Sequence, residues 1–359
     1  MKREFIDPWS ANLPENHKDI IKKFGLEKFD VRDFPKPNLL MRRGFVFSGR
    51  DLKIISDCIK NRKKFYALTG IMPTSDKIHF GTKSVIDQMI YFQNHGAETY
   101  VLVADLEAAA TRGVDLKEAR TRALEIHIPC YIALGLDAKK TRFYFQSENN
   151  DVRNLAFELS NKATLNEYKA IYGNAEPSRI MASILQVADI LHPQLNKSMP
   201  GIVPIGIDQD PHIRLSRDIT NRAKKFGFIL PSSINVKFLP SLSGGLKMSK
   251  SEGNSLYLLD SDEEIKKKVA KALTGGRKTS KEQREKGANP DKDMLFELFR
   301  QHLIKNDDRL TKREEDYKKG KILDSENKEY ATKLLIEFMH DFRRKYEKAR
   351  RKTKRLFRD

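Results

Sequence analysis

The sequence predicts an α/β protein with a parallel β-sheet, followed by an α-helical region. Residues 64–70 form an apolar run that ends in a glycine, and residues 99–104 form a second apolar run. Between them, apolar residues recur at helical spacing from Val85 to Phe92. A strand, a helix and a second strand in this order make a βαβ unit, whose two strands are parallel. From Ser261 onward the pattern is helical, and we expect 261–359 to form an α-helical domain.

The remaining boundaries follow from the pattern along the chain. We expect residues 1–60 to form an N-terminal extension, with a strand within 42–48 and a helix over 51–59 that begins near a serine. Residues 61–260 form the main domain in this interpretation, and about 106–200 are a mainly helical insertion.

Several local signals refine the middle of the chain. Asp115 and Glu118 have the spacing of a capping box, which predicts a helix start. Pro129 should kink that helix, because proline cannot donate a backbone hydrogen bond. The pattern predicts a strand over residues 141–145 and mostly helical structure over 150–197.

A short strand over 202–205 leads into a polar segment. Asp210 and Pro211 are a suitable N-cap and first residue for the next helix. Gly206 and Asp208 follow the carboxyl end of the strand, where a doubly wound sheet places a nucleotide ribose. Asp208 could accept from ribose hydroxyls, or could instead cap the following helix.

Composition limits the classes of function. Of 359 residues, 68 are Lys or Arg and 49 are Asp or Glu, which gives a formal net charge of +19 and favours a polyanionic partner. No apolar run reaches the length of a membrane span, and the first residues lack the apolar core of a signal peptide. The two cysteines, Cys58 and Cys130, provide no disulfide framework and no set of metal ligands. We expect a cytoplasmic protein.

Residues 246–254 contain the most informative motif. Lys247 and Lys250 flank Met248 and Ser249, and a Ser-Glu-Gly-Asn run follows. Two flexible ammonium groups, hydroxyls and backbone N–H groups are suited to hold a triphosphate. A solvated loop has the same composition, so a second motif must decide between the two interpretations.

That second motif follows the first strand. Thr74 and Ser75 lie in a turn, and His79 and Gly81 come where the helical pattern begins. A helix N-terminus after a strand is an anion site, because its free N–H groups and dipole favour phosphate. His79 can donate a hydrogen bond to a phosphoryl oxygen, and Gly81 lets a nucleotide approach the backbone. A lone histidine is more often structural than functional. Here, however, the two motifs are separated by a length suited to one nucleotide-binding domain, which favours the functional interpretation.

Together the motifs resemble those of class I aminoacyl-tRNA synthetases. Residues 246–254 are similar to the KMSKS motif, and 79–82 to the HIGH motif, with Thr82 in place of the last histidine. Further segments are similar to the tryptophanyl-tRNA synthetases of the archaeal/eukaryotic type: 5–9, 40–44, 47–48, 206–211 and Arg214 with Arg217 and Asp218.

The resemblance implies a Rossmann-type doubly wound parallel sheet with a helical insertion that forms a homodimer, and a C-terminal α-helical domain that binds the anticodon. It implies ATP-dependent activation of L-tryptophan and transfer to tRNA(Trp), with ATP and Mg²⁺ as cofactors and no metal-binding side chains. His79, Lys247 and Lys250 would be catalytic. The ATP site would comprise Thr74, Ser75, His79, Gly81, Gly206, Asp208 and residues 247–250.

The resemblance also implies an amino-acid pocket. Gln186 and Gln209 would hold the ammonium or carboxylate group of the substrate. Asp189, three residues after Gln186 on one helix face, or Glu107, just past a strand end, would accept from the indole N–H. Leu68 would line the pocket.

Related enzymes place a tyrosine and a glutamine where Leu68 and Ala104 fall here, so this chain departs from the pattern. Three alternatives remain open: a tyrosyl-tRNA synthetase, another nucleotidylyltransferase and a catalytically silent RNA-binding paralogue. The retained lysines argue against the last.

The C-terminal end is strongly basic. Residues 341–359 contain ten Lys or Arg and three acidic residues. Apolar residues recur at helical spacing from Tyr330 to Tyr346, so one helix face should pack while the other is cationic. A cationic face suits the RNA phosphate backbone, which is recognised by charge.

Overall fold

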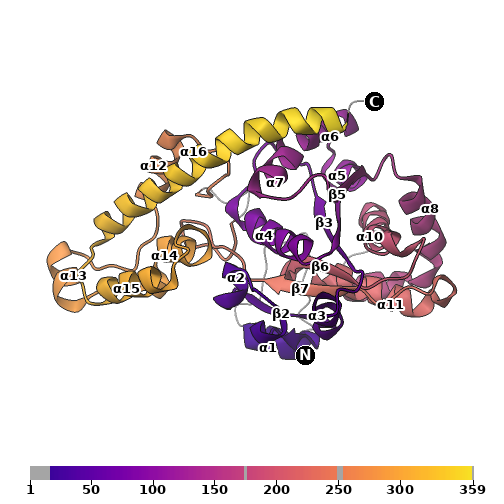
Figure 1. Ribbon diagram of the computed structural model, residues 1–359, viewed down its shortest axis with the longest axis horizontal. Helices are drawn as coiled ribbons and strands as arrows, with labels where there is room; N and C mark the ends of the chain where they lie inside the picture. Colours follow the sequence, from indigo (N-terminus) through magenta and orange to yellow (C-terminus); the bar gives the residue numbers. More distant parts are fainter. Residues whose placement is uncertain (1–16, 174–175, 249–253, 358–359) are drawn as a thin grey trace.

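The structure is a computed structural model that describes residues 17–173, 176–248 and 254–357 (Figure 1). Its centre is a seven-stranded sheet with the order β1-β2-β7-β6-β3-β4-β5. The strands are β1 (Glu27–Lys28), β2 (Val46–Arg50), β3 (Tyr66–Ile71), β4 (Glu98–Val103), β5 (Thr141–Phe145), β6 (Gly201–Gly206) and β7 (Ser232–Val236). The α-helices are α1 (His17–Phe24), α2 (Leu39–Arg42), α3 (Leu52–Lys60), α4 (Phe80–Asn94), α5 (Asp105–Arg112), α6 (Leu116–Arg122), α7 (Ile128–Leu134), α8 (Asn150–Leu159), α9 (Leu165–Tyr172), α10 (Pro177–Leu191), α11 (Asp210–Arg222), α12 (Asp262–Ala270), α13 (Ser280–Lys286), α14 (Met294–Leu298), α15 (Asp307–Lys318) and α16 (Asp324–Leu356).

Five strands, β7-β6-β3-β4-β5, are mutually parallel, which confirms the predicted fold class. The chain builds outward from β3 in two directions, so β3 and β6 flank the point where the strand order reverses. These two strands pair at Tyr66–Gly201 and Ala67–Ile202, near their starts. A Cβ atom on Gly201 would lie 1.9 Å from the Tyr66 ring, so only glycine fits where the two strands meet. The site lies beyond this pairing, at the carboxyl ends of the strands.

Residues within the expected N-terminal extension join the sheet. β2 runs antiparallel to β7, and β1 antiparallel to β2. The predicted strand begins at Val46 rather than at residue 42, and Ser48 lies inside it. Asp51 (φ +49°) is therefore the residue that precedes α3, and its side chain makes no capping hydrogen bond. β5 likewise lies within the range predicted for the helical insertion, where it pairs with β4.

The helix around Pro129 continues through the proline, with a π-helical segment directly before it. Asp115 accepts hydrogen bonds from the backbone N–H groups of Lys117 and Glu118 and so begins α6. Residues 123–127 form a π-helical segment that leads directly into α7. Because Pro129 has no N–H, the carbonyl of Glu125 loses its helical donor. The Tyr346 hydroxyl of α16 donates to that carbonyl instead, at 2.7 Å.

The C-terminal helices pack against the main domain. α16, yellow in Figure 1, crosses the top of the molecule from α12 to α7. Its buried face includes Leu335, Met339, Phe342 and Tyr346, as the sequence pattern predicts. One hydrophobic cluster extends across residue 260, where we placed a domain boundary. No helix within residues 17–173, 176–248 and 254–357 is long and apolar enough to cross a membrane.

Candidate active site

A cavity of about 670 Å³ opens at the carboxyl ends of β3 and β6. Among the predicted site residues, those that line it are Leu68, Thr74, His79, Gly81, Glu107, Gln186, Gly206, Asp208, Gln209, Lys247 and Met248. Ser75 and Asp189 are not part of its wall. Ser249 and Lys250 lie outside the described residues, as do residues 5–9, which contributed to the resemblance.

The phosphate-binding half is built at the start of α4. His79 is the N-cap residue, with extended backbone, and its side chain makes no capping hydrogen bond. Gly81 and Thr82 of the first helical turn line the cavity, whereas the N–H groups of Phe80 and Thr82 already donate to the carbonyls of Leu256 and His79. A Cβ atom on Gly81 would lie 2.9 Å from Nδ1 of His79. Glycine at this position therefore leaves room for the histidine ring, a role that the sequence analysis did not predict.

The segment that follows the KMSKS-like motif contacts the HIGH-like motif directly. His79 forms an antiparallel bridge with Tyr257. The N–H of Phe80 donates to the carbonyl of Leu256 at 3.2 Å, and the N–H of Leu258 donates to the carbonyl of Ile78 at 2.8 Å. The two motifs, far apart in sequence, are therefore fixed to each other by backbone hydrogen bonds.

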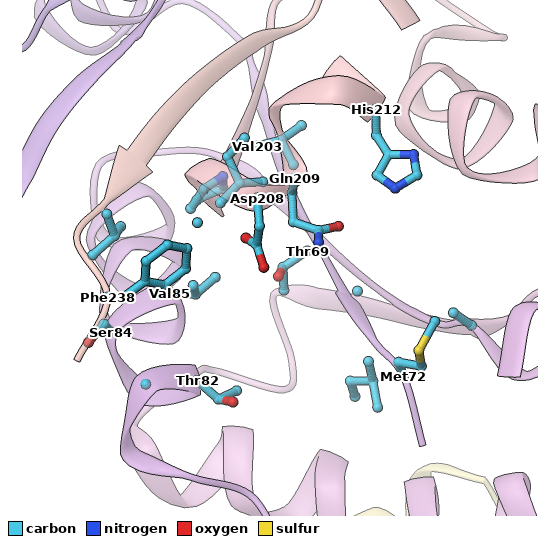
Figure 2. A pocket seen from close by; sticks show the side chains of 18 of the residues that line it. Thr69, Met72, Thr82, Ser84, Val85, Val203, Asp208, Gln209, His212 and Phe238 are labelled. Carbon is cyan, nitrogen blue, oxygen red and sulfur yellow. The ribbon is translucent and has the colours of Figure 1, made fainter. Parts of the chain in front are cut away.

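Lys247 and Asp208 form an ion pair across the cavity. The Lys247 ammonium lies 3.2 Å from Oδ2 of Asp208, and both side chains are largely buried. Figure 2 shows Asp208 and Gln209 projecting from one short helix toward Thr69 at the end of β3. A Cβ atom on Gly206 would lie 2.6 Å from the Phe238 ring, so glycine leaves room for this arrangement. The alternative role of Asp208 as a helix cap is not seen.

Asp210 is not the N-cap that its position before Pro211 suggested. Gln209 precedes α11, and its side chain makes no capping hydrogen bond. The fully buried Asp210 carboxylate instead accepts two hydrogen bonds of 2.9 Å from Arg50 of β2. A buried carboxylate needs a charged partner more than a helix needs a cap.

Ser75 serves the structure of the turn rather than the cavity. Its hydroxyl is 3.3 Å from both the N–H and the carbonyl oxygen of Lys77. Its carbonyl accepts a hydrogen bond from His127 of the π-helical segment at 2.9 Å. The predicted contact between Ser75 and phosphate has no geometric support.

The amino-acid half contains two polar groups suited to a ligand. The Oε1 atom of Gln186 is buried and accepts no hydrogen bond from any described residue. Such an acceptor is costly unless a ligand donates to it. Glu107 lines the same cavity with 5% of its surface exposed, and burial raises the pKa of its carboxyl to about 8.

Asp189 points away from the cavity. Tyr144 donates to one carboxylate oxygen at 2.9 Å and Gln146 donates to the other at 2.6 Å. Asp189 is fully buried, and burial raises the pKa of its carboxyl to about 7. Of the two acids that could accept from an indole N–H, the structure thus places only Glu107 at the cavity wall.

Known proteins resemble this chain over nearly its whole length. A family model described as tRNA synthetases class I (W and Y) matches residues 60–340. The chain is 38% identical to the tryptophan–tRNA ligase of Methanocaldococcus jannaschii, over 98% of this chain and 97% of the relative. It is 39% identical to the tryptophan–tRNA ligase of Hyperthermus butylicus, over 96% and 95%. This chain belongs to the class I tRNA synthetases.

The same family is found among solved structures. The crystal structure of tryptophanyl-tRNA synthetase from Aeropyrum pernix matches with a TM-score of 0.91 and 38% identity, and the match covers 98% of each chain. That of Plasmodium falciparum matches with a TM-score of 0.84 and 29% identity, over 92% of this chain and 94% of that one.

The cavity residues of the synthetase that the sequence analysis did not single out include Thr69, Arg112 and His212. His212 is buried, and burial lowers the pKa of its imidazole to about 3, so the ring is neutral. Its Nδ1 lies 2.9 Å from the Tyr172 hydroxyl. Its position in the first turn of α11, directly after β6, was a signal that could have found it.

Proposed function

We propose that the synthetase is a tryptophan–tRNA ligase, which activates L-tryptophan with ATP and transfers it from the adenylate to tRNA(Trp). The observation that carries this proposal is that His79 of one class I motif and Lys247 of the other line the same cavity. The Phe80–Leu256 and Leu258–Ile78 hydrogen bonds hold the segment after the KMSKS-like motif against the HIGH-like motif. The curated relatives named above, which are tryptophan–tRNA ligases, support tryptophan over tyrosine.

Catalysis of activation rests on positioning and charge. A carboxylate oxygen of tryptophan attacks the α-phosphorus of ATP, and pyrophosphate leaves. His79 and the N–H group of Gly81 at the start of α4 would donate to the phosphoryl oxygens as charge develops there. Asp208 would accept from the ribose hydroxyls, which releases Lys247 to follow the pyrophosphate. Lys250 and Ser249 complete this set in the prediction from sequence.

The amino-acid half would hold tryptophan at both ends. Gln186 offers its buried Oε1 to the α-ammonium group, because that acceptor has no donor among the described residues. Gln209, which lines the same cavity, would hold the substrate carboxylate. Glu107 would accept from the indole N–H, while Leu68 and Ala104 supply apolar walls.

Magnesium would arrive with the nucleotide. The described residues contain no group of three His, Cys, Asp or Glu side chains able to hold a metal ion. Mg²⁺ commonly binds through substrate phosphates and water with few protein ligands, so the site fits a Mg²⁺–ATP complex. The ion would neutralise phosphate charge there.

The tRNA would bind along the cationic face of α16. Lys348, Arg351 and Arg355 are exposed and form no ion pair with a described residue. Arg350 and Lys354, by contrast, are paired with Glu125. Unpaired cations on one helix face suit phosphate contacts. The anticodon-binding role of 261–359 and the cytoplasmic location remain predictions.

The deciding experiment is ATP–pyrophosphate exchange measured with each of the twenty amino acids, followed by aminoacylation of tRNA(Trp) and tRNA(Tyr). We expect exchange with tryptophan alone and charging of tRNA(Trp). Preference for tyrosine would establish the tyrosyl alternative, and exchange without any amino acid would indicate another nucleotidylyltransferase. Absence of both exchange and charging, with tRNA still bound, would establish the silent paralogue.

The predicted homodimer has a candidate surface on the helical insertion. Three large apolar side chains there are solvent-exposed: Phe157 of α8 by 81%, Met181 of α10 by 61% and Leu165 of α9 by 52%. Exposed apolar side chains of this size favour a protein interface. Phe157→Asp should convert a dimer to a monomer in sedimentation, whereas Ile54→Asp on α3 should not. An unchanged dimer in the Phe157 variant would place the interface elsewhere.

A further inference from the structure

The turn that positions Thr74 and His79 at the cavity is held by two hydrogen bonds from a neighbouring helical segment. Nε2 of His127 donates to the carbonyl oxygen of Ser75 at 2.9 Å, so this nitrogen carries the proton. Nε of Arg122 donates to Oδ1 of Asp76 at 3.0 Å. His127 is buried, whereas Asp76 is exposed. The hydrogen bond from His127 is therefore better shielded from water than the one from Arg122.

The π-helical segment brings both side chains to the same turn. Five residues of an α-helix rotate ~500°, which leaves Arg122 and His127 ~140° apart around the axis. In a π-helix, hydrogen bonds join residues five apart, which places them near one another on one face. Pro129 follows this segment and cannot donate to the Glu125 carbonyl, and the Tyr346 hydroxyl donates to that carbonyl. Arg350 also binds the Glu125 carboxylate, at 2.8 Å.

We propose that His127 is a positioning residue for the ATP site, acting through the carbonyl of Ser75. This inference rests on the proposed function, since it takes the cavity side of the turn to bind the phosphates of ATP. His127 itself touches no substrate. Its hydrogen bond fixes the turn so that Thr74 and His79 face the cavity before ATP arrives. Without that bond, ATP must order the turn as it binds, at the expense of affinity and rate.

The kinetic test compares His127→Ala and His127→Gln with the wild type in tryptophan-dependent pyrophosphate exchange. His127→Ala should lower kcat/KM for ATP roughly 3- to 10-fold, the worth of one neutral hydrogen bond, and change KM for tryptophan less than about twofold. Glutamine keeps an N–H donor and should restore most of the loss. The matched control is His95→Ala, which removes a bond of the same type, between Nδ1 and the Tyr91 carbonyl at 2.7 Å, at the other end of α4.

Equal losses for ATP and tryptophan, or no recovery with glutamine, would show a general structural role and overturn the proposal. If His127→Ala does not fold, His127→Leu fills the buried space while still removing the donor, and the same comparison applies. Circular dichroism and thermal unfolding establish which variants are folded.

A second measurement needs no substrate. Hydrogen–deuterium exchange of the amides within 72–80 should be roughly 3- to 10-fold faster in His127→Ala, because the turn opens more often. Thr74 reports on this directly, since its N–H donates to the Met72 carbonyl at 2.9 Å. Unchanged amide exchange would overturn the inference even with an active wild type. An inactive wild-type enzyme would refute the proposed function. Faster amide exchange in His127→Ala would still show that the His127–Ser75 hydrogen bond fixes the turn.

Discussion

Replacing Glu107 with glutamine should remove a large part of the pH dependence of folding stability. Burial raises the pKa of the Glu107 carboxyl from 4.5 to about 8, and the nearby Asp189 carboxylate adds to this rise. Between these two values the folded protein keeps a proton that the unfolded chain has lost. Stability attributable to Glu107 is therefore present at low pH and declines as pH rises towards 8.

The magnitude follows from the size of the pKa shift. Each pKa unit corresponds to ~1.4 kcal/mol, so Glu107 should lower the free energy of unfolding by ~3 kcal/mol between pH 5 and pH 8. Urea unfolding at pH 5, 6, 7 and 8, followed by circular dichroism, would measure it. The difference between wild type and Glu107→Gln should fall by that amount across the series. The exposed Glu329→Gln is the control, and its difference should stay constant.

Parallel pH profiles for wild type and Glu107→Gln would refute this reasoning, because they would mean that Glu107 ionises at similar pH in both states. The same titration falls in the range of activity assays. If the ionised carboxylate accepts from the indole N–H, KM for tryptophan should fall as pH rises from 7 to 8. Glu107→Gln should lose that trend, and Asp189→Asn should keep it.

Three further predictions concern the phosphates and the tRNA. His79→Ala should slow adenylate formation by ~2–4 kcal/mol of barrier while KM for tryptophan stays within about twofold, as measured by pyrophosphate exchange; an unchanged exchange rate would falsify its role. Lys247→Ala should slow activation but spare transfer from preformed adenylate, because pyrophosphate is absent from the second step; equal losses in single-turnover assays of both steps would contradict this. Neutralising Lys348, Arg351 and Arg355 together should reduce the salt slope of tRNA binding by about 1 for each lost phosphate contact and leave exchange intact. An unchanged slope in filter binding would leave α16 without a role in RNA binding. Substitution is preferable to truncation, because the buried Tyr346 and Thr353 alternate with these cations.

The parallel core was predictable because its strands carry local apolar signals. β7 could not be predicted in this way, because three of its five residues are polar. Ser233 and Asn235 are nevertheless fully buried, and Asn235 donates to the Ser48 hydroxyl at 3.0 Å. The Asn235 amide nitrogen finds its acceptor on β2, nearly two hundred residues earlier in the chain. No local pattern could have indicated the pairing.

The errors at the site have the same origin. Asp210 before Pro211 is a good capping signal, but Arg50 of a distant strand takes its carboxylate. Gln186 and Asp189 share a helix face by spacing, yet Tyr144 and Gln146 hold Asp189 behind the cavity wall. Helical spacing gives the direction of a side chain to within part of a turn. Helical spacing cannot show which of two neighbouring side chains is hydrogen-bonded by another element of the fold.

We expect the indole to be recognised at a different wall of the cavity in this synthetase. Leu68 on β3 and Ala104 after β4 line the cavity at the positions where related enzymes carry a tyrosine and a glutamine. Two hydrogen-bonding groups are thus replaced by apolar surface, which binds the indole by burial. Glu107, less than a turn beyond Ala104, is then left as a buried acid at the cavity wall, and burial raises the pKa of its carboxyl. Phenylalanine would leave that acid unpaired, whereas tryptophan would donate to it, so we expect discrimination between the two to depend on Glu107.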